Sequence, residues 1–171
     1  MEQHHTHTST SALYVRNFIF GVEDSLVSTV GLLSGIAIAD VPRTTIFLVG
    51  IVLIFVEAFS MGVGSFLSEH SVKDYLYGGA TKQTRNFIGS VIMFLSYFAS
   101  GFIPLAPYII LPTTIAFWVS IVVSCGALLL LGYVSARLSH TSVWRSSLRM
   151  FLIGGAAIVL GVLVGRFTSQ L

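Results

Sequence analysis

The chain has 171 residues, of which 54% are hydrophobic and only 9% are charged, and its formal net charge is +2. Soluble domains carry about 25% charged residues, so this composition indicates an integral membrane protein in contact with the lipid bilayer. The small net charge argues against nucleic acid as a partner. The one cysteine, Cys125, cannot form a disulfide within the chain.

Five segments are long and apolar enough to cross a bilayer, which takes about 20 residues per helix. They are roughly Asn17–Ala39, Thr44–Ser68, Asn86–Ile103, Thr114–Ser135 and Leu148–Phe167. We therefore expect an all-α membrane protein whose residues 14–171 form five transmembrane helices. Residues 1–13 form a polar, His-rich tail, which we expect to be disordered, and we expect no cleavable signal peptide.

Polar and proline-rich stretches separate these spans. A short link from Glu69 to Arg85 lies between the second and third spans. Proline disfavours a helix interior, so we expect the chain to break between the third and fourth spans at Pro104, Pro107 and Pro112. Residues 106–111 are also apolar and leave open a longer third helix.

Basic residues are divided unequally between the two ends of the spans. Only Arg43 and Arg166 lie on the side of the membrane opposite the N-terminus, where the chain ends after five spans. The other seven are Arg16, Lys73, Lys82, Arg85, Arg137, Arg145 and Arg149. Because basic residues are retained in the cytoplasm, we expect a cytosolic N-terminus and a C-terminus on the opposite side. In a prokaryote the membrane would be the cell membrane.

Glu23 and Asp24 interrupt the apolar first span. A carboxylate in hydrocarbon is costly and normally faces a protein interior or a water-filled path. On a helix, Asp24 shares a face with Ser28, Gly31 and Gly35, whereas Glu23 points about 100° away. This pattern favours Asp24 as an ion ligand and Glu23 as a secondary candidate. The alternative for both acids is an ion pair with Arg16.

Glu57 lies near the middle of the second span, and Met61 follows one turn later on the same face, which Ser65 and Ser68 continue. Burial favours the neutral form of a carboxyl group and a bound divalent ion favours the charged form, so Glu57 could exchange a proton for a metal. A carboxylate with a thioether suits a borderline ion such as Fe²⁺ without being diagnostic of it. The alternative for Met61 is a flexible core side chain.

Three further metal-binding residue types follow the second span: Glu69, His70 and Asp74. The last two would share a face if the helix continues. Metal contact is one interpretation, and a solvated cap at the membrane surface is the favoured one. The N-terminal tail carries three histidines, His4, His5 and His7. They could concentrate metal, but a merely polar tail is favoured.

Small residues recur at the spacing that allows helices to approach closely. The pairs are Gly31 and Gly35, Ser60 and Gly64, and Gly161 and Gly165. Packing within one subunit is the favoured interpretation of any single pair, and contact with a second copy in a homodimer is the alternative. The sequence contains no nucleophile elbow, phosphate-binding glycine loop or paired-cysteine metal site, so we expect no enzyme and no tightly bound cofactor.

Several motifs are informative through their order and spacing. They are Tyr14 to Leu26, Ser60 to Gly64, Ser96-Tyr97 with Ile103 to Tyr108, Gly132 to Ser139, and Ile153 to Gly155 with Gly165-Arg166. Together they resemble the vacuolar iron transporter family along nearly the whole chain. The resemblance implies a homodimer with an ion pathway at the two-fold interface, which exports Fe²⁺ and often Mn²⁺ from the cytosol in exchange for protons. Asp24 matches the family's pathway aspartate and Met61 its pathway methionine.

The sequence departs from the family pattern at several positions. The family's second-helix glutamate lies two turns before the methionine, where this chain has Leu53, and Glu57 is displaced by about 6 Å along the helix. Asn17 stands where an acid is often found, and Ser25 replaces the glycine that follows the aspartate.

The link of residues 69–85 is too short for the Glu-rich metal-binding domain of the plant and fungal iron transporters. A bacterial or nodulin-like member therefore fits best, and export of Fe²⁺ or Mn²⁺ is the expected function. Two alternatives stay open: transport of another cation, such as Zn²⁺ or a small organic cation, and a membrane scaffold protein that transports nothing.

Overall fold

The computed structural model describes residues 2–77, 84–139 and 141–170. In this part of the chain it has five α-helices and no strand. The helices are α1 (Glu2–Ile38), α2 (Arg43–Tyr77), α3 (Thr84–Ile110), α4 (Thr113–Leu138) and α5 (Val143–Thr168). Each contains a stretch long and apolar enough to cross a membrane. The predicted all-α fold with five spans is therefore confirmed.

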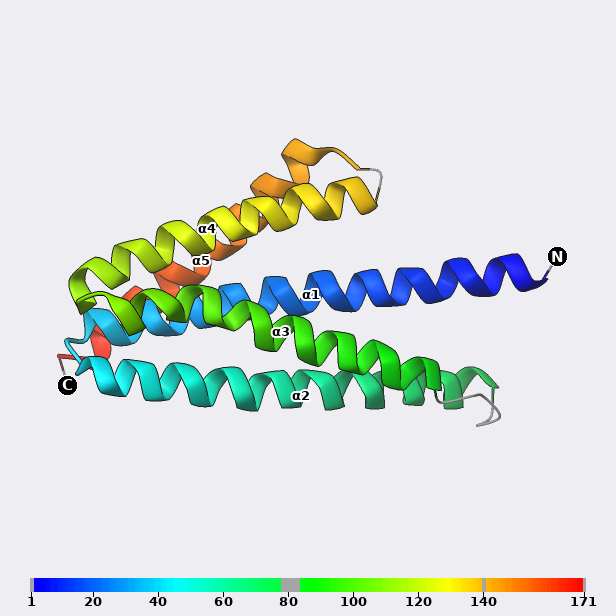
Figure 1. Ribbon diagram of the computed structural model, residues 1–171, viewed down its shortest axis with the longest axis horizontal. Helices are drawn as coiled ribbons and strands as arrows, with labels where there is room; N and C mark the ends of the chain where they lie inside the picture. The colour runs from blue at the N-terminus through cyan, green and yellow to red at the C-terminus, as the bar shows by residue number, and fades with distance from the viewer. Residues whose placement is uncertain (1, 78–83, 140, 171) are drawn as a thin grey trace.

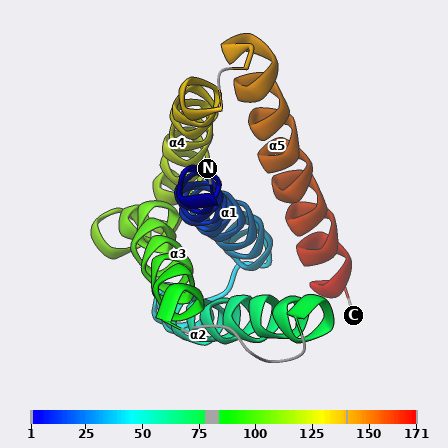
Figure 2. The same cartoon turned by 90° about the vertical axis from the view of Figure 1, so that its right-hand side faces the viewer.

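Helix α1 is the centre of the bundle (Figures 1 and 2). It packs against each of the other four helices, whereas α2 and α5 make no substantial contact with each other among the described residues. Two clusters of buried apolar side chains include Leu33, Ile54 and Leu105 on one side of α1 and Leu26, Leu128 and Met150 on the other. The face of α1 between α2 and α5 is therefore not covered by another helix of the subunit.

Helices α1 and α5 meet backbone to backbone through small residues. A Cβ atom added to Gly161 or Gly165 would collide with the backbone carbonyl oxygen of Gly31 or Gly35, respectively. Close backbone approach of this kind stabilises helix pairs in membranes through van der Waals contact. Two of the three predicted small-residue pairs thus pack helices within one subunit, as the favoured interpretation held.

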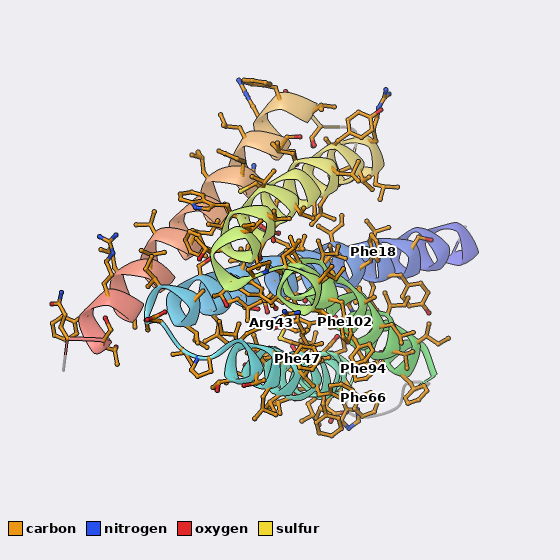
Figure 3. All side chains as sticks on the ribbon, turned by 60° about the vertical axis from the view of Figure 1, so that its left-hand side comes forward. Phe18, Arg43, Phe47, Phe66, Phe94 and Phe102 are labelled. Atoms are coloured by element: carbon orange, nitrogen blue, oxygen red, sulfur yellow. The ribbon has the colours of Figure 1, made fainter. Side chains whose placement is uncertain are left out.

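Helix α2 packs mainly against α3 and to a lesser extent against α1. There the ring of Phe55 meets that of Phe98 edge-on with centroids 5.0 Å apart, and Figure 3 labels Phe94 and Phe102 along the same helix. The third small-residue pair, Ser60 and Gly64, is exposed on α2 and lines a groove that α1 and α3 also border. A Cβ atom added to Gly64 would meet no described atom within 4 Å.

The expected break at Pro104 and Pro107 is wrong, because α3 continues through both residues to Ile110. Transmembrane helices tolerate proline where neighbouring groups restore polar contacts. Nearby, the Ser120 hydroxyl, on α4, donates a hydrogen bond of 2.7 Å to the Pro104 carbonyl oxygen, which holds α4 against the proline-containing part of α3. Of the three prolines in this region, only Pro112, at the N-cap of α4, separates two helices.

Arg43 ties the start of α2 to the end of α3 (Figure 3). Its Nε donates to the Tyr108 carbonyl oxygen at 2.6 Å, and its Nη2 donates to the carbonyl oxygen of Ile109. The last carbonyl groups of a helix lack partners within the helix. Arg43 therefore caps α3 and closes this end of the bundle.

Two helices extend beyond their predicted spans. Helix α1 begins at Glu2, so the tail that we expected to be disordered has a helical backbone, and α2 continues through Glu69 to Tyr77. Lys82 lies outside the described residues, as do the side chains of Lys73 and Arg85 and those of His4, His5 and His7. The other predicted cytosolic basic residues lie toward the end of the bundle where α1 begins (Figure 1). That this end faces the cytosol stays a prediction.

Candidate cation site

Helices α1 and α2 each contribute one half-buried carboxylate to a common site. Asp24 lies on α1 and Glu57 on α2, close enough for their charges to interact. Neither forms an ion pair with a basic side chain in the described part of the chain. Two neighbouring carboxylates in an apolar span are costly unless protons or a cation neutralise them. The pair is therefore suited to binding a cation.

Asp24 opens onto a groove of about 650 Å³ between α1 and α5. The α1 wall of this groove includes Asp24, Ser28, Gly31 and Gly35. The predicted shared face of these residues is therefore confirmed. Most of the remaining lining is small or apolar, so Asp24 supplies the only carboxylate of the groove among the described residues.

A second groove, of about 580 Å³, lies between α1, α2 and α3. Its lining includes Met61, Ser65 and Ser68 of α2, which confirms their predicted shared face. Phe20 lines the same groove one helical turn before Asp24, and Met61 follows Glu57 by one turn. Glu57 itself is not among the lining residues of either groove, and its link to Asp24 is the electrostatic interaction between the two carboxylates.

Met93, on α3, adds a second thioether to this groove. It is almost fully buried, and a Cβ atom added to Gly21 of α1 would lie 3.3 Å from its sulfur. The sequence analysis did not identify Met93 as a candidate ligand. A methionine within an apolar span carries no local signal that separates a ligand from a core residue.

Tyr97, on α3, forms a third side of the carboxylate site. Its side chain is fully buried, and its hydroxyl oxygen lies 2.7 Å from the Ser28 Oγ. The charges of both Asp24 and Glu57 reach this hydroxyl group. The sequence analysis treated Tyr97 only as part of a motif. Ser28, a polar residue on the same helix face as Asp24, was the one local indication in the sequence that a polar partner from another helix lies near this face.

Arg16 does not pair with Glu23 or Asp24, which was the alternative considered for these acids. Its Nη2 lies 2.7 Å from Glu69 Oε1 and donates to Asn17 Oδ1 at 3.3 Å. Glu23 interacts electrostatically with Asp24 and with Arg149 of α5. It also lines a different groove, which includes the end of α4. Glu23 therefore lies to the side of the Asp24–Glu57 pair.

The three candidate ligands beyond the second span are on one continuous helix. His70 Nε2 lies 3.4 Å from Asp74 Oδ2, so their predicted shared face is confirmed. Glu69 is engaged by Arg16. The described residues of one subunit contain no group of three or more His, Cys, Asp or Glu side chains that could hold a metal ion. Metal contact at these three positions stays a prediction.

Comparison with known proteins identifies the family. A sequence profile of the VIT family matches residues 15–88 and 79–166. Vacuolar iron transporter 1 of Tulipa gesneriana is 22% identical over 217 residues, covering 92% of this chain and 88% of the relative. Vacuolar iron transporter 2 of Oryza sativa subsp. japonica is 23% identical over the same shares. The vacuolar iron transporter of Toxoplasma gondii is 33% identical over 70 residues, which are 41% of this chain and 23% of that relative. With five membrane-spanning helices and a family match along most of its length, the chain is a multi-pass integral membrane protein and belongs to the VIT family.

Proposed function

We propose that the protein transports a divalent transition metal, Fe²⁺ or Mn²⁺, out of the cytosol in exchange for protons. One observation carries this proposal above the others. Asp24 and Glu57 lie on two membrane-spanning helices within electrostatic range of each other, with no basic side chain paired to either among the described residues. Intramembrane carboxylates of this kind mark ion and proton pathways.

The ligand chemistry favours a borderline metal. Asp24 and Glu57 offer hard oxygen atoms, and Met61 offers a softer thioether one turn from Glu57. A carboxylate must be deprotonated to bind metal, whereas two empty carboxylates repel each other and favour proton uptake. Alternating occupancy by a metal ion and by protons therefore follows from the same two side chains.

A homodimer would complete the site. The described residues of one subunit bring too few ligands together for a full coordination shell, and no other helix of the described structure covers the α1 face between α2 and α5. A two-fold axis along this face would bring two copies each of Asp24, Glu57 and Met61 together. The exposed Ser60 and Gly64 on α2 would allow the second copy to approach closely.

The relatives support iron as a substrate and also differ from this chain. Those from tulip and rice are named vacuolar iron transporters. Their aligned stretch of 217 residues is longer than this chain of 171, so they carry residues that it lacks. The two profile matches meet at residues 79–88, between α2 and α3. We infer that this protein loads metal without a separate cytosolic metal-binding domain.

Transport into proteoliposomes tests the proposal. When a metal gradient and a pH gradient are imposed across the proteoliposome membrane, the unaltered protein should transport Fe²⁺ and Mn²⁺. Asp24→Asn and Glu57→Gln should each reduce the transport rate at least about tenfold. Asp40→Asn is the matched control, because Asp40 is an exposed acid in the turn after α1 and asparagine tolerates its positive φ of 57°.

Unchanged transport by Asp24→Asn and Glu57→Gln would overturn the assignment of the site. Competition by Zn²⁺ or by an organic cation that exceeds competition by Fe²⁺ and Mn²⁺ would assign a different substrate. No ion movement by the unaltered protein would favour a scaffold role.

A further inference from the structure

We propose that Ser28 supplies an oxygen ligand to the cation held by Asp24 and Glu57, and that Tyr97 is the positioning residue that directs this oxygen. The proposal rests on the proposed function and specifies its site further. It assigns two hydroxyl groups on α1 and α3 to the coordination of the transported ion.

The two hydroxyl groups connect the interior of the bundle to the groove. Tyr97 is fully buried on α3, and its hydroxyl oxygen lies 2.7 Å from Ser28 Oγ. Ser28 is only half-buried and lines the α1–α5 groove together with Asp24, one helical turn earlier. Ser28 is thus the member of the pair that an ion in the groove could reach.

The Ser28 hydroxyl oxygen has a lone pair that its hydrogen bonds do not use. When Tyr97 donates its proton to Ser28 Oγ, the serine oxygen keeps a lone pair and its own proton. The only other contact of the Ser28 hydroxyl in the described structure is a long one of 3.4 Å to the Ser25 carbonyl oxygen. A lone pair on Ser28 therefore remains free for a metal ion, and a neutral oxygen is a ligand that Mn²⁺ and Fe²⁺ accept.

Tyr97 is held firmly enough to act as a positioning residue. The Ser25 hydroxyl donates to the Tyr97 carbonyl oxygen at 2.7 Å, which fixes α3 against α1. Because the charges of Asp24 and Glu57 both reach the Tyr97 hydroxyl, the hydroxyl pair lies beside the carboxylates. Three helices then surround one ion, with Asp24 and Ser28 from α1, Glu57 from α2 and the supporting hydrogen bond from α3.

Mn²⁺ binding to the purified full-length protein in detergent micelles, measured by isothermal titration calorimetry, tests this arrangement. Ser28→Ala and Tyr97→Phe should each raise the Kd for Mn²⁺ about tenfold, as loss of a supporting hydrogen bond does at other metal sites. The double variant should be no weaker than Ser28→Ala, because both substitutions remove the same directed oxygen. Additive losses would overturn the positioning role, since a purely structural effect of Tyr97 would add to that of Ser28.

Matched controls separate these effects from general destabilisation. Ser34→Ala removes a buried α1 hydroxyl that has no hydrogen-bond partner in the described structure. Tyr108→Phe removes another buried phenol from α3. Both should leave the Kd within about twofold of the unaltered protein, and thermal unfolding of each variant reports its folding. If Tyr97→Phe does not fold, Ser28→Ala alone decides: an unchanged Kd overturns the proposal and a raised Kd supports its ligand.

Asp24→Asn distinguishes failure of this inference from failure of the proposed function. Loss of Mn²⁺ binding in Asp24→Asn together with unchanged binding in Ser28→Ala would overturn only the assignment of Ser28 as a ligand. Unchanged Mn²⁺ binding in Asp24→Asn would overturn the assignment of the cation site itself, and the proposed role of Ser28 would fail with it.

Discussion

At the scale of single residues, the groove between α1, α2 and α3 combines two thioethers with hydroxyl groups. Met61 is one turn from Glu57, whereas Met93 lies against α1 near Gly21. Sulfur is a softer ligand than oxygen and favours Fe²⁺ over Mn²⁺. Because Met61 lies beside a carboxylate, we expect it to influence metal preference rather than act only as a packing residue.

Met61→Leu should lower the Fe²⁺ rate at least about threefold relative to the Mn²⁺ rate, because it removes the sulfur and nearly conserves volume. Competition between the two ions in proteoliposome uptake measures this ratio. Met150→Leu is the control, since Met150 is buried in the cluster of α1, α4 and α5 away from the groove. An unchanged ratio in Met61→Leu would make Met61 a packing residue.

Asn17 joins three helices at the N-terminal end of the groove. Its Nδ2 donates to Ser65 Oγ at 3.0 Å and to the Gly89 carbonyl oxygen at 2.9 Å, and the side chain is fully buried. Asn17→Ala should lower the free energy of unfolding by about 1–3 kcal/mol, measured by thermal unfolding in micelles. Ser71→Ala, which removes a hydroxyl bonded only within α2, should change it little. Equal stability of the two variants would contradict this role.

The sequence identified some of these residues and not others for a physical reason. Asp24 and Glu57 were predictable because the cost of a carboxylate in an apolar span is a local property. Tyr97 and Met93 were not, because their roles depend on the register of α3 against α1. The Arg16–Glu69 ion pair likewise joins residues from two helices.

At the scale of helices, the contact between α1 and α5 sets one wall of the site. Glycines on both helices bring the two backbones together beside the groove that contains Asp24. Any side chain at these glycines would push α5 away and widen that groove. The geometry of the candidate cation site therefore depends on glycines, which have no side-chain ligand of their own.

Gly161→Ala should cost about 1–3 kcal/mol through overpacking, because its Cβ atom would collide with the Gly31 carbonyl oxygen. Thermal unfolding in micelles measures the change. Gly155→Ala, on the same helix but with no described atom within 4 Å of the added Cβ, is the control and should be neutral or slightly stabilising. Equal destabilisation by both substitutions would show that α1 and α5 do not pack in this way.

The number of helices and most of their extents followed from hydropathy, because an apolar stretch long enough to span a bilayer is visible in one sequence. The end of α3 did not. Pro104 and Pro107 lie within a helix that packs against α1, α2 and α4, and the sequence does not show which helices are neighbours. Composition alone also did not predict the helical backbone of residues 2–13.

At the scale of the whole molecule, one subunit leaves its candidate site open. The exposed part of α2 beside the candidate site includes Ser60 and Gly64, which line the same groove as Met61. Such a surface suits either lipid or a second copy, and the incomplete ligand set favours the second copy. A two-fold axis close to α2 would place each residue on this side near its own counterpart.

Cross-linking tests this arrangement in native membranes. In a Cys125→Ser background, Ser60→Cys should give a covalent dimer with a short bifunctional maleimide, because equivalent residues near a two-fold axis lie close together. Val122→Cys is the control, since Val122 is 67% exposed on α4, which is not part of the proposed interface. Cross-linking of Val122→Cys but not of Ser60→Cys would contradict an interface along α2.

The most direct test of the central claim is to locate a bound ion. Crystals of the full chain grown with Mn²⁺ should give an anomalous difference peak beside Asp24 and Glu57, close to the second copy of α2 and within about 2.5 Å of carboxylate oxygens. Asp24→Asn crystals grown in the same way should lose the peak. Peaks confined to the region of Glu69, His70 and Asp74, with none at the Asp24–Glu57 pair, would contradict the account.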